Sequence, residues 1–211
     1  MQRTILRVMA VAAALCPAVA FAQSPKAATY ITDEEVKKVN SQPGVDRTIR
    51  VVDIGTEHFA VGIIHRGPTG AGRGAAAGGS AAATTEPCGQ AATAPPANDA
   101  PSGITHDSQT EGYVVVSGGG TLVTGGHIVN GRKSAPDSDV TKVLNGPSCS
   151  GIIASAEVVK KKVKTGDIII IPAGVPHGWM DIVDHVDYLS VRPDPVRVLA
   201  AGYVNPALQK K

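Results

Sequence analysis

The sequence predicts an all-β protein built from many short antiparallel strands, with one short helix near the N-terminus. Its 211 residues include 24 Gly and 15 Pro, and frequent turns between short strands need these two residue types. Short segments rich in valine and isoleucine recur along the chain and are separated by Gly, Pro, Asn and Asp, which are turn-forming residues. About eight to ten such strands fit a double-sheet jelly-roll barrel.

The charge balance excludes partners that bind mainly through electrostatic attraction. The chain carries 20 Lys and Arg against 18 Asp and Glu. Both extra positive charges, Arg3 and Arg7, lie in a segment that we expect to be removed. A balanced mature chain of this length is one domain with appendages, and it is not suited to binding nucleic acid or an anionic membrane surface.

Residues 1–22 have the pattern of a secretory signal peptide. Arg3 and Arg7 precede an apolar run at residues 8–15, and Ala20-Phe21-Ala22 forms an A-x-A cleavage site. The alternative is a membrane anchor, but the apolar run is shorter than the ~20 residues that span a bilayer. We therefore expect export to the periplasm or secretion, with no membrane attachment after cleavage.

Residues 23–45 form an N-terminal segment that contains the one clear helix, at 32–39. Thr32 can cap this helix, and Glu35 stands three residues later, as in a capping box. Acidic residues fill the first turn and lysines the last turn, which suits the helix dipole. We expect the helix to lie on the barrel surface or at a subunit contact of a homodimer, without a chemical role.

The barrel itself is expected to span residues 46–200, followed by a C-terminal tail at 201–211. We predict its strands at 48–52, 59–65, from 104, 112–117, 121–124, around 152–153 and 158–159, and at 168–171 and 186–192.

Four segments between or within these strands have a specific interpretation. Gly118-Gly119-Gly120 is expected to be a turn, and residues 130–138 a polar loop. Residues 160–164 are rich in lysine, which is typical of a solvated edge strand. The four isoleucines at 168–171 cannot alternate between faces, so they predict a strand buried on both sides.

Residues 67–102 have a different composition from the rest of the barrel. They are rich in Ala and Gly and contain no Val, Ile, Leu, Met or aromatic residue. Such a segment buries too little apolar surface to offset the entropy of ordering it, so we interpret it as a low-complexity insertion between strands. It is either a mobile lid over the barrel mouth or inert padding. Cys88 within it and Cys149 could form a disulfide in an exported protein, or could remain two free thiols.

Two stretches share the spacing of known sequence motifs. Gly166–His177 contains Gly, five residues, Pro, one residue, Gly, two residues and His. His106–Gly118 contains His, four residues, Glu, six residues and Gly. These spacings, in this order, resemble the two motifs of the cupins. The resemblance covers roughly residues 104–181 and implies a double-stranded β-helix, the jelly-roll barrel of that family.

The resemblance also implies a metal site at one end of the barrel. His106, Glu111 and His177 occupy the motif positions that hold ligands, and this set suits a divalent Fe, Mn, Ni, Cu or Zn ion. In the first motif the family has a further His two residues before the position of His106, but this chain has Ile104 there. His65 could supply a fourth ligand if it faces inward; otherwise it is a hydrogen-bonded structural residue.

The remaining aromatic and histidine candidates are weaker. His127 follows a glycine pair and could line the barrel mouth, whereas His58 and His185 lie beside polar turn residues and are expected to be exposed. Tyr113 and Trp179 flank the ligand positions and are expected to belong to the core. Serine-hydrolase, phosphate-loop and zinc-protease motifs do not occur in the sequence.

Three functions remain open at this point, because cupins have many activities. The first is a metal-dependent enzyme, a dioxygenase or isomerase, that acts on a small molecule outside the cytoplasm. The second is a small-molecule-binding protein without turnover. The third is a vestigial cupin that no longer holds metal.

Overall fold

The computed structural model describes residues 26–69, 83–94 and 99–209. The predicted signal peptide, residues 1–22, lies outside these ranges. In chain order the elements are α1 (Asp33–Asn40), β1 (Asp46–Asp53), β2 (His58–Arg66), β3 (Ala83–Cys88), β4 (Ser102–His106), β5 (Glu111–Thr124), β6 (His127–Ser134), the π-helical turn η2 (Val140–Leu144), β7 (Ser148–Ala154), β8 (Val159–Lys164), β9 (Ile168–Ile171), β10 (His177–Met180), β11 (Val186–Asp194) and the 3₁₀ turn η3 (Pro206–Leu208).

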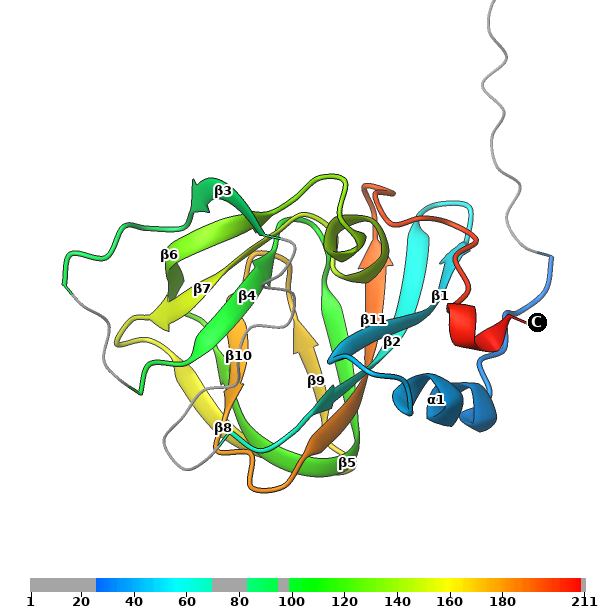
Figure 1. The fold of residues 1–211 in the computed structure, drawn as a ribbon, viewed down its shortest axis with the longest axis horizontal. Coiled ribbons are helices and arrows are strands. Elements are labelled where there is room, and N and C mark those ends of the chain that lie inside the picture. The colour runs from blue at the N-terminus through cyan, green and yellow to red at the C-terminus, as the bar shows by residue number, and fades with distance from the viewer. Residues whose placement is uncertain (1–25, 70–82, 95–98, 210–211) are drawn as a thin grey trace, which may run out of the picture.

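The strands form two antiparallel sheets that share one long strand, and together they enclose a barrel (Figure 1). The first sheet has the order β1-β2-β11-β5-β9. The second sheet contains the other half of β5, which pairs with β8 and β10, and continues through β4, β7, β6 and β3. The predicted all-β, double-sheet barrel is confirmed. No helix among the described residues has the length and apolar character needed to cross a membrane.

The predicted turn at Gly118-Gly119-Gly120 is wrong, because β5 runs through it without a break. The strand bends there as it passes from one sheet into the other. Gly118 has φ +67°, and a Cβ atom on it would lie 2.0 Å from the carbonyl oxygen of His185. A Cβ atom on Gly119 would lie 2.5 Å from the carbonyl oxygen of Val163. Glycine is therefore needed here for a bend and for close packing, not for a chain reversal.

The polar loop predicted at 130–138 is also partly wrong, because β6 continues to Ser134. Asn130 has φ +50°, and the pairing with β7 shifts between Val129 and Arg132. This irregularity is a bulge, which inserts an extra residue into a strand without ending it. The Asn-Gly pair therefore marks a bulge within a strand where a polar loop was expected.

The isoleucine strand β9 is not buried on both sides. Ile171 is 2% exposed, whereas Ile168 and Ile170 are 71% and 75% exposed. The prediction fails because Ile168 and Ile170 lie on the outer face of β9, the last strand of the first sheet. Its inner side chains reach the barrel interior, but no element covers its outer side among the described residues.

The N-terminal helix α1 forms as the sequence predicts. Thr32 accepts a hydrogen bond from the backbone N–H of Glu35, whose carboxylate accepts one from the backbone N–H of Thr32. This capping box satisfies two amides at the start of the helix. Val39 of α1 packs with Ile49 of β1 and Ile63 of β2, so the helix covers part of the outer face of the first sheet.

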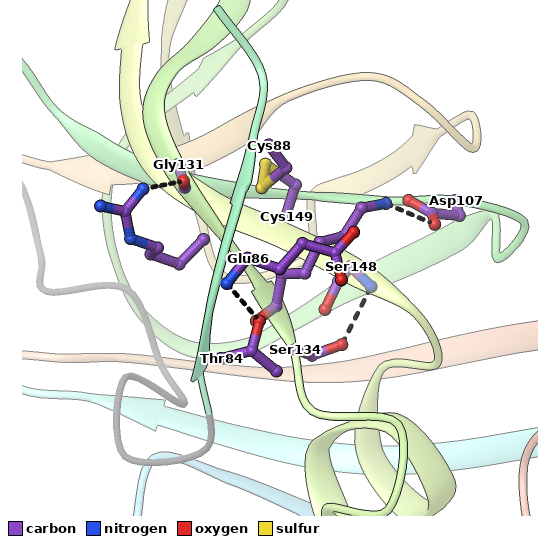
Figure 2. The surroundings of a disulfide bond; sticks show 10 residues. Thr84, Glu86, Cys88, Asp107, Gly131, Ser134, Ser148 and Cys149 are labelled. Carbon is purple, nitrogen blue, oxygen red and sulfur yellow. Dashed lines mark hydrogen bonds and ion pairs between the residues drawn. A yellow bond between two sulfur atoms is a disulfide. The ribbon is translucent and has the colours of Figure 1, made fainter. Parts of the chain in front are cut away.

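The insertion at 67–102 contains an ordered strand, contrary to the expectation that it has almost nothing to pack. Strand β3 pairs with β6, and Cys88 at its end forms a disulfide with Cys149 of β7 (Figure 2). Low apolar content was an incomplete criterion, because backbone pairing and a covalent link also hold a segment in place. The parts of the insertion at 70–82 and 95–98 lie outside the described residues.

Candidate functional site

Three polar side chains meet at one end of the barrel, each from the end of a different strand. His106 is the last residue of β4, Glu111 the first of β5 and His177 the first of β10. Each is at most 3% exposed. One nitrogen or oxygen atom from each lies within 4.8 Å of the others. The fold therefore brings together three residues that are far apart in sequence.

The hydrogen bonding of His177 leaves an unprotonated nitrogen facing Glu111. Its Nδ1 atom lies 3.0 Å from the carbonyl oxygen of Val175, which can only accept, so Nδ1 carries the proton. The Nε2 atom lies 3.0 Å from Oε2 of Glu111 and makes no hydrogen bond among the described residues. Two acceptors at this distance repel each other unless a proton or a cation lies between them.

His106 faces the same carboxylate oxygen. Its Nε2 atom lies 3.1 Å from Oε2 of Glu111, close to the corresponding distance from His177. Neighbouring ligands of one transition-metal ion lie about 3 Å apart when each is about 2.0–2.2 Å from the metal. Imidazole and carboxylate are also ligand types that such ions accept. The donor set of His106, Glu111 and His177 therefore fits a divalent transition metal.

The other carboxylate oxygen of Glu111 is occupied by protein groups. Its Oε1 accepts hydrogen bonds from Ser190 Oγ and from Arg192 Nε, both at 2.7 Å. Tyr113 donates to Oε2, also at 2.7 Å. These bonds fix the orientation of the carboxylate and direct Oε2 toward both imidazoles.

Arg192 connects this site to the rest of the barrel. It is 1% exposed, and its terminal nitrogens donate to the backbone carbonyl oxygen of Leu144 and to Oδ2 of Asp46, each at 2.7 Å. Asp46 is the first residue of β1. One buried guanidinium therefore neutralises part of the charge of two carboxylates from separate strands.

The protonation states match those that a metal needs. Burial lowers the pKa of His106 below its ordinary value, and the nearby Glu111 carboxylate offsets this only in part. Burial would raise the pKa of Glu111, but His106 and Arg192 outweigh it and hold that pKa well below its usual range. Neutral imidazole and ionised carboxylate are the forms that bind metal.

Aromatic rings wall the site. Tyr113 and Tyr188 pack with ring centroids 4.3 Å apart, and Trp179 stacks on Tyr188 at 5.2 Å. All three are at most 3% exposed, as the sequence predicts for Tyr113 and Trp179. They also line the cavity at the site, so they are core residues and pocket walls at once.

The cavity beside the three ligand candidates is small. The centre of a water molecule could occupy a volume of about 20 Å³ there. About 10–15 Å³ on this measure holds one water molecule. Ile104 lines the cavity and pairs directly with His177 across β4 and β10, so it faces the site as predicted. An apolar side chain therefore stands where a fourth nitrogen ligand was expected from the family motif.

Comparison with known proteins gives similarity of fold only. No protein-family model and no curated protein matches this sequence. Similar solved structures include BH2720 from Bacillus halodurans, at 11% identity and TM-score 0.43, covering 87% of this chain and 93% of that one. Another is an uncharacterised protein with a double-stranded β-helix domain from Klebsiella pneumoniae, at 17% identity and TM-score 0.37, covering 81% and 92%. A third is the polyketide cyclase RemF from Streptomyces resistomycificus, at 16% identity and TM-score 0.36, covering 79% and 80%.

The chain forms two facing antiparallel sheets joined by one continuous strand. His106, Glu111 and His177 lie together at one end. The fold is a double-stranded β-helix barrel.

His65 does not supply a fourth ligand in this barrel. Side chains alternate along β2, so His65 lies on the opposite face from Ile64, which lines the cavity. His65 is exposed, and its Nδ1 atom lies 2.6 Å from Oδ1 of Asp187. Its ring stacks on that of His185 on the outside of the barrel.

The other histidines also lie outside the site. His58 is buried, contrary to the prediction that it is exposed, and its Nδ1 donates to the carbonyl oxygen of Leu199 at 2.7 Å. His185 is partly exposed and contacts Asp184. His127 lines a separate groove at the second sheet and does not reach the cavity at the metal ligands.

Several charged and polar residues of the site are missing from the sequence prediction. Asp46, Arg66, Ser190 and Arg192 line the cavity or bond to Glu111. The alternation along β11 was the available signal, because Ser190, Arg192 and Asp194 share a face with the apolar Val186 and Tyr188. Polar residues on the apolar face of a strand indicate a buried polar network inside the barrel.

Proposed function

We propose that this protein binds one divalent transition-metal ion, Fe, Mn, Ni, Cu or Zn, through His106, Glu111 and His177. The observation that supports this most strongly is the 3.0 Å contact between His177 Nε2 and Glu111 Oε2. Because His177 Nδ1 donates to Val175, Nε2 is the nitrogen that faces Glu111, and a metal cation between Nε2 and Oε2 would relieve the repulsion between these two atoms.

A metal bound by three protein ligands keeps coordination positions open and supplies Lewis acidity to a small-molecule substrate. We propose an oxygenase or isomerase type of reaction on such a substrate. The protein residues then have separate tasks. Tyr113 and Arg192 orient the carboxylate of Glu111, while Trp179 and Tyr188 exclude bulk water from the site.

Binding of a small molecule without turnover is the second candidate. The small volume of the cavity, about 20 Å³, and the replacement of a nitrogen ligand by Ile104 favour it. Oxygen uptake by the metal-loaded protein, offered small phenols and organic acids in turn, separates these two functions. Uptake above that of the metal-free protein supports the enzyme, and binding of the same compounds without uptake supports the non-catalytic protein.

Metal analysis tests the proposal directly. The protein is purified without a His-tag and without chelators, and offered each of the five metals in turn. We expect close to one ion per chain for at least one metal after gel filtration. A protein that retains none of the five metals contradicts the proposal, and the vestigial cupin then replaces it.

We further propose that the chain is exported to the periplasm or secreted after cleavage before Gln23. The pattern of residues 1–22 supports this. The disulfide between Cys88 and Cys149 agrees with it, because such bonds persist mainly outside the cytoplasm. The intact mass of the mature protein tests this proposal, and a chain that still begins at Met1 contradicts it.

A homodimer is the partner arrangement that we propose. The exposed Ile168 and Ile170 lie on β9, the last strand of the first sheet. On the adjoining β5, Val116 is 41% exposed. Apolar side chains gathered on an uncovered sheet face are typical of a subunit contact, and an edge strand can pair with its symmetry mate.

A further inference from the structure

We propose that the cavity beside His106, Glu111 and His177 binds a small anion of about the size of formate, and that Arg66 selects this anion by its charge. The inference rests on the proposed function, because the anion would share the cavity with the metal. It adds a substrate class and a specificity-determining residue to that site.

The first argument is the balance of charge around the cavity. Asp46, Glu111, Arg66 and Arg192 line it, and Arg192 bonds to both carboxylates at 2.7 Å. Two positive and two negative side chains therefore balance before any metal is present. A divalent ion would leave two positive charges without compensation in a buried site, which is strongly unfavourable. An anion in the same cavity reduces this excess, whereas a neutral molecule does not.

The second argument is the position of Arg66. It is the last residue of β2 and shares the inner face of that strand with Ile64. Both side chains line the cavity, and Arg66 Nε donates to the hydroxyl of Tyr188 at 3.1 Å. Arg66 is partly exposed, whereas Arg192 is 1% exposed. Of the two guanidinium groups, Arg66 is therefore the one that lies between the cavity and solvent, where it can attract an entering anion.

The third argument is a hydrogen-bond donor without an acceptor. Trp179 lines the cavity and is 1% exposed, and its indole N–H has no partner among the described residues. An indole N–H can only donate, and a buried donor without an acceptor is costly. A carboxylate oxygen would satisfy it.

The size of the cavity limits the anion. The cavity volume of about 20 Å³ corresponds to one or two water-sized groups. Formate, the smallest carboxylate, is the anion nearest to this size, whereas benzoate is much larger.

Formate and formamide form a matched pair for the test, because they have the same number of heavy atoms and differ in charge. Each is titrated into Co²⁺-loaded protein, and binding is followed by the visible absorption of Co²⁺ and by calorimetry. We expect formate to bind at least about tenfold more tightly than formamide, because a charge–charge interaction at short range exceeds that factor at an effective dielectric constant near 20. Benzoate should not bind. Equal affinities for formate and formamide, or benzoate binding as tightly as formate, overturn the inference.

The role of Arg66 is tested in the same titration. Arg66→Met should weaken formate binding about tenfold or more and leave the formamide affinity unchanged. Arg132→Met is the matched control, because Arg132 is an exposed arginine of the second sheet, and it should bind formate like the wild type. An unchanged formate affinity in Arg66→Met overturns the assignment of Arg66. If that variant does not fold, the formate and formamide comparison in the wild type still decides the anion preference. Failure to load Co²⁺ and each of the five metals contradicts the proposed function, whereas loading without a preference for formate contradicts this inference alone.

Discussion

Glu111 uses its two carboxylate oxygens differently. Oε1 accepts hydrogen bonds from Ser190 and Arg192, whereas Oε2 faces His106 and His177. We therefore expect Glu111 to bind a metal through Oε2 alone, with Arg192 as a positioning residue. The buried guanidinium also keeps Glu111 ionised, because the positive charge holds the pKa of that carboxyl down.

Removing the positive charge of Arg192 should destabilise the fold. Arg192→Met leaves the buried Glu111 and the partly buried Asp46 without their shared cation, which should cost about 3–5 kcal/mol of unfolding free energy. Urea unfolding in the presence of a chelator measures it. Arg197→Met is the control, because Arg197 forms a partly exposed ion pair with Asp53 and its loss should cost only about 0–1 kcal/mol. Equal losses in the two variants would show that the buried network adds nothing to stability.

The pKa of His106 predicts how stability depends on pH. Its folded pKa is lowered from 6.5, so below that pH the unfolded chain binds a proton that the folded chain does not. The stability of the metal-free protein should therefore fall as the pH drops below 6.5, by up to about 1.4 kcal/mol per pH unit. Glu111 acts in the same direction at lower pH, since its depressed pKa gives stability that is present above 4.5 and lost on further acidification.

Unfolding of the wild type and of His106→Gln between pH 5 and pH 6.5 tests this. The unfolding free energy of the variant should depend less steeply on pH, and the difference in slope should correspond to about one proton. The same slope in both proteins would mean that His106 binds its proton equally well in the folded state.

The three ligand candidates could be predicted from sequence, because each occupies a fixed place in a motif. Strand alternation could indicate that Arg192 faces the core, but its contact with Glu111 could not be predicted, because Arg192 lies 81 residues from Glu111 and belongs to neither motif. Only the pairing of β11 with β5 places it beside the carboxylate. The outward orientation of His65 could not be predicted either, because strand alternation gives two faces and does not say which is inside.

At the scale of the elements, helix α1 and most strands follow from capping residues and apolar periodicity. Errors arose where one residue type has two structural uses. Gly118-Gly119-Gly120 permits a bend within β5, although glycine clusters more often mark turns. The exposed Ile168 and Ile170 show that a run of isoleucines does not guarantee burial when the strand lies at the edge of a sheet.

Strand β3 is predicted to depend on its disulfide. Cys88→Ser with Cys149→Ala opens a covalent link that spans 61 residues of sequence, and this should lower the unfolding free energy by about 2–5 kcal/mol. Thermal unfolding with and without dithiothreitol measures the effect. The reductant should lower the melting temperature of the wild type and leave that of the double variant unchanged. A double variant as stable as the oxidised wild type would show that β3 is held by strand pairing alone.

At the scale of the whole molecule, closure of the barrel creates the site and also leaves one sheet face uncovered. Helix α1 covers the outer face at β1 and β2, but β9 remains open. Ile168→Lys with Ile170→Lys should convert the proposed homodimer into a monomer, because burying two lysines at the contact is unfavourable. Light scattering after gel filtration measures the mass. Val196→Lys, at another exposed valine, should remain dimeric, and a wild type that is monomeric at all concentrations contradicts the dimer.

Metal stoichiometry of single-residue variants tests the central claim most directly. Wild type, His106→Ala, Glu111→Gln, His177→Ala, His65→Ala and His185→Ala are loaded with the metal that the wild type retains, desalted and analysed by mass spectrometry for metal per chain. We predict close to one ion in the wild type and in the two surface variants, His65→Ala and His185→Ala. Substitution of any of the three candidate ligands should remove most of the metal. Full metal content in His177→Ala and Glu111→Gln, or metal loss in His65→Ala, would contradict the assignment of the site.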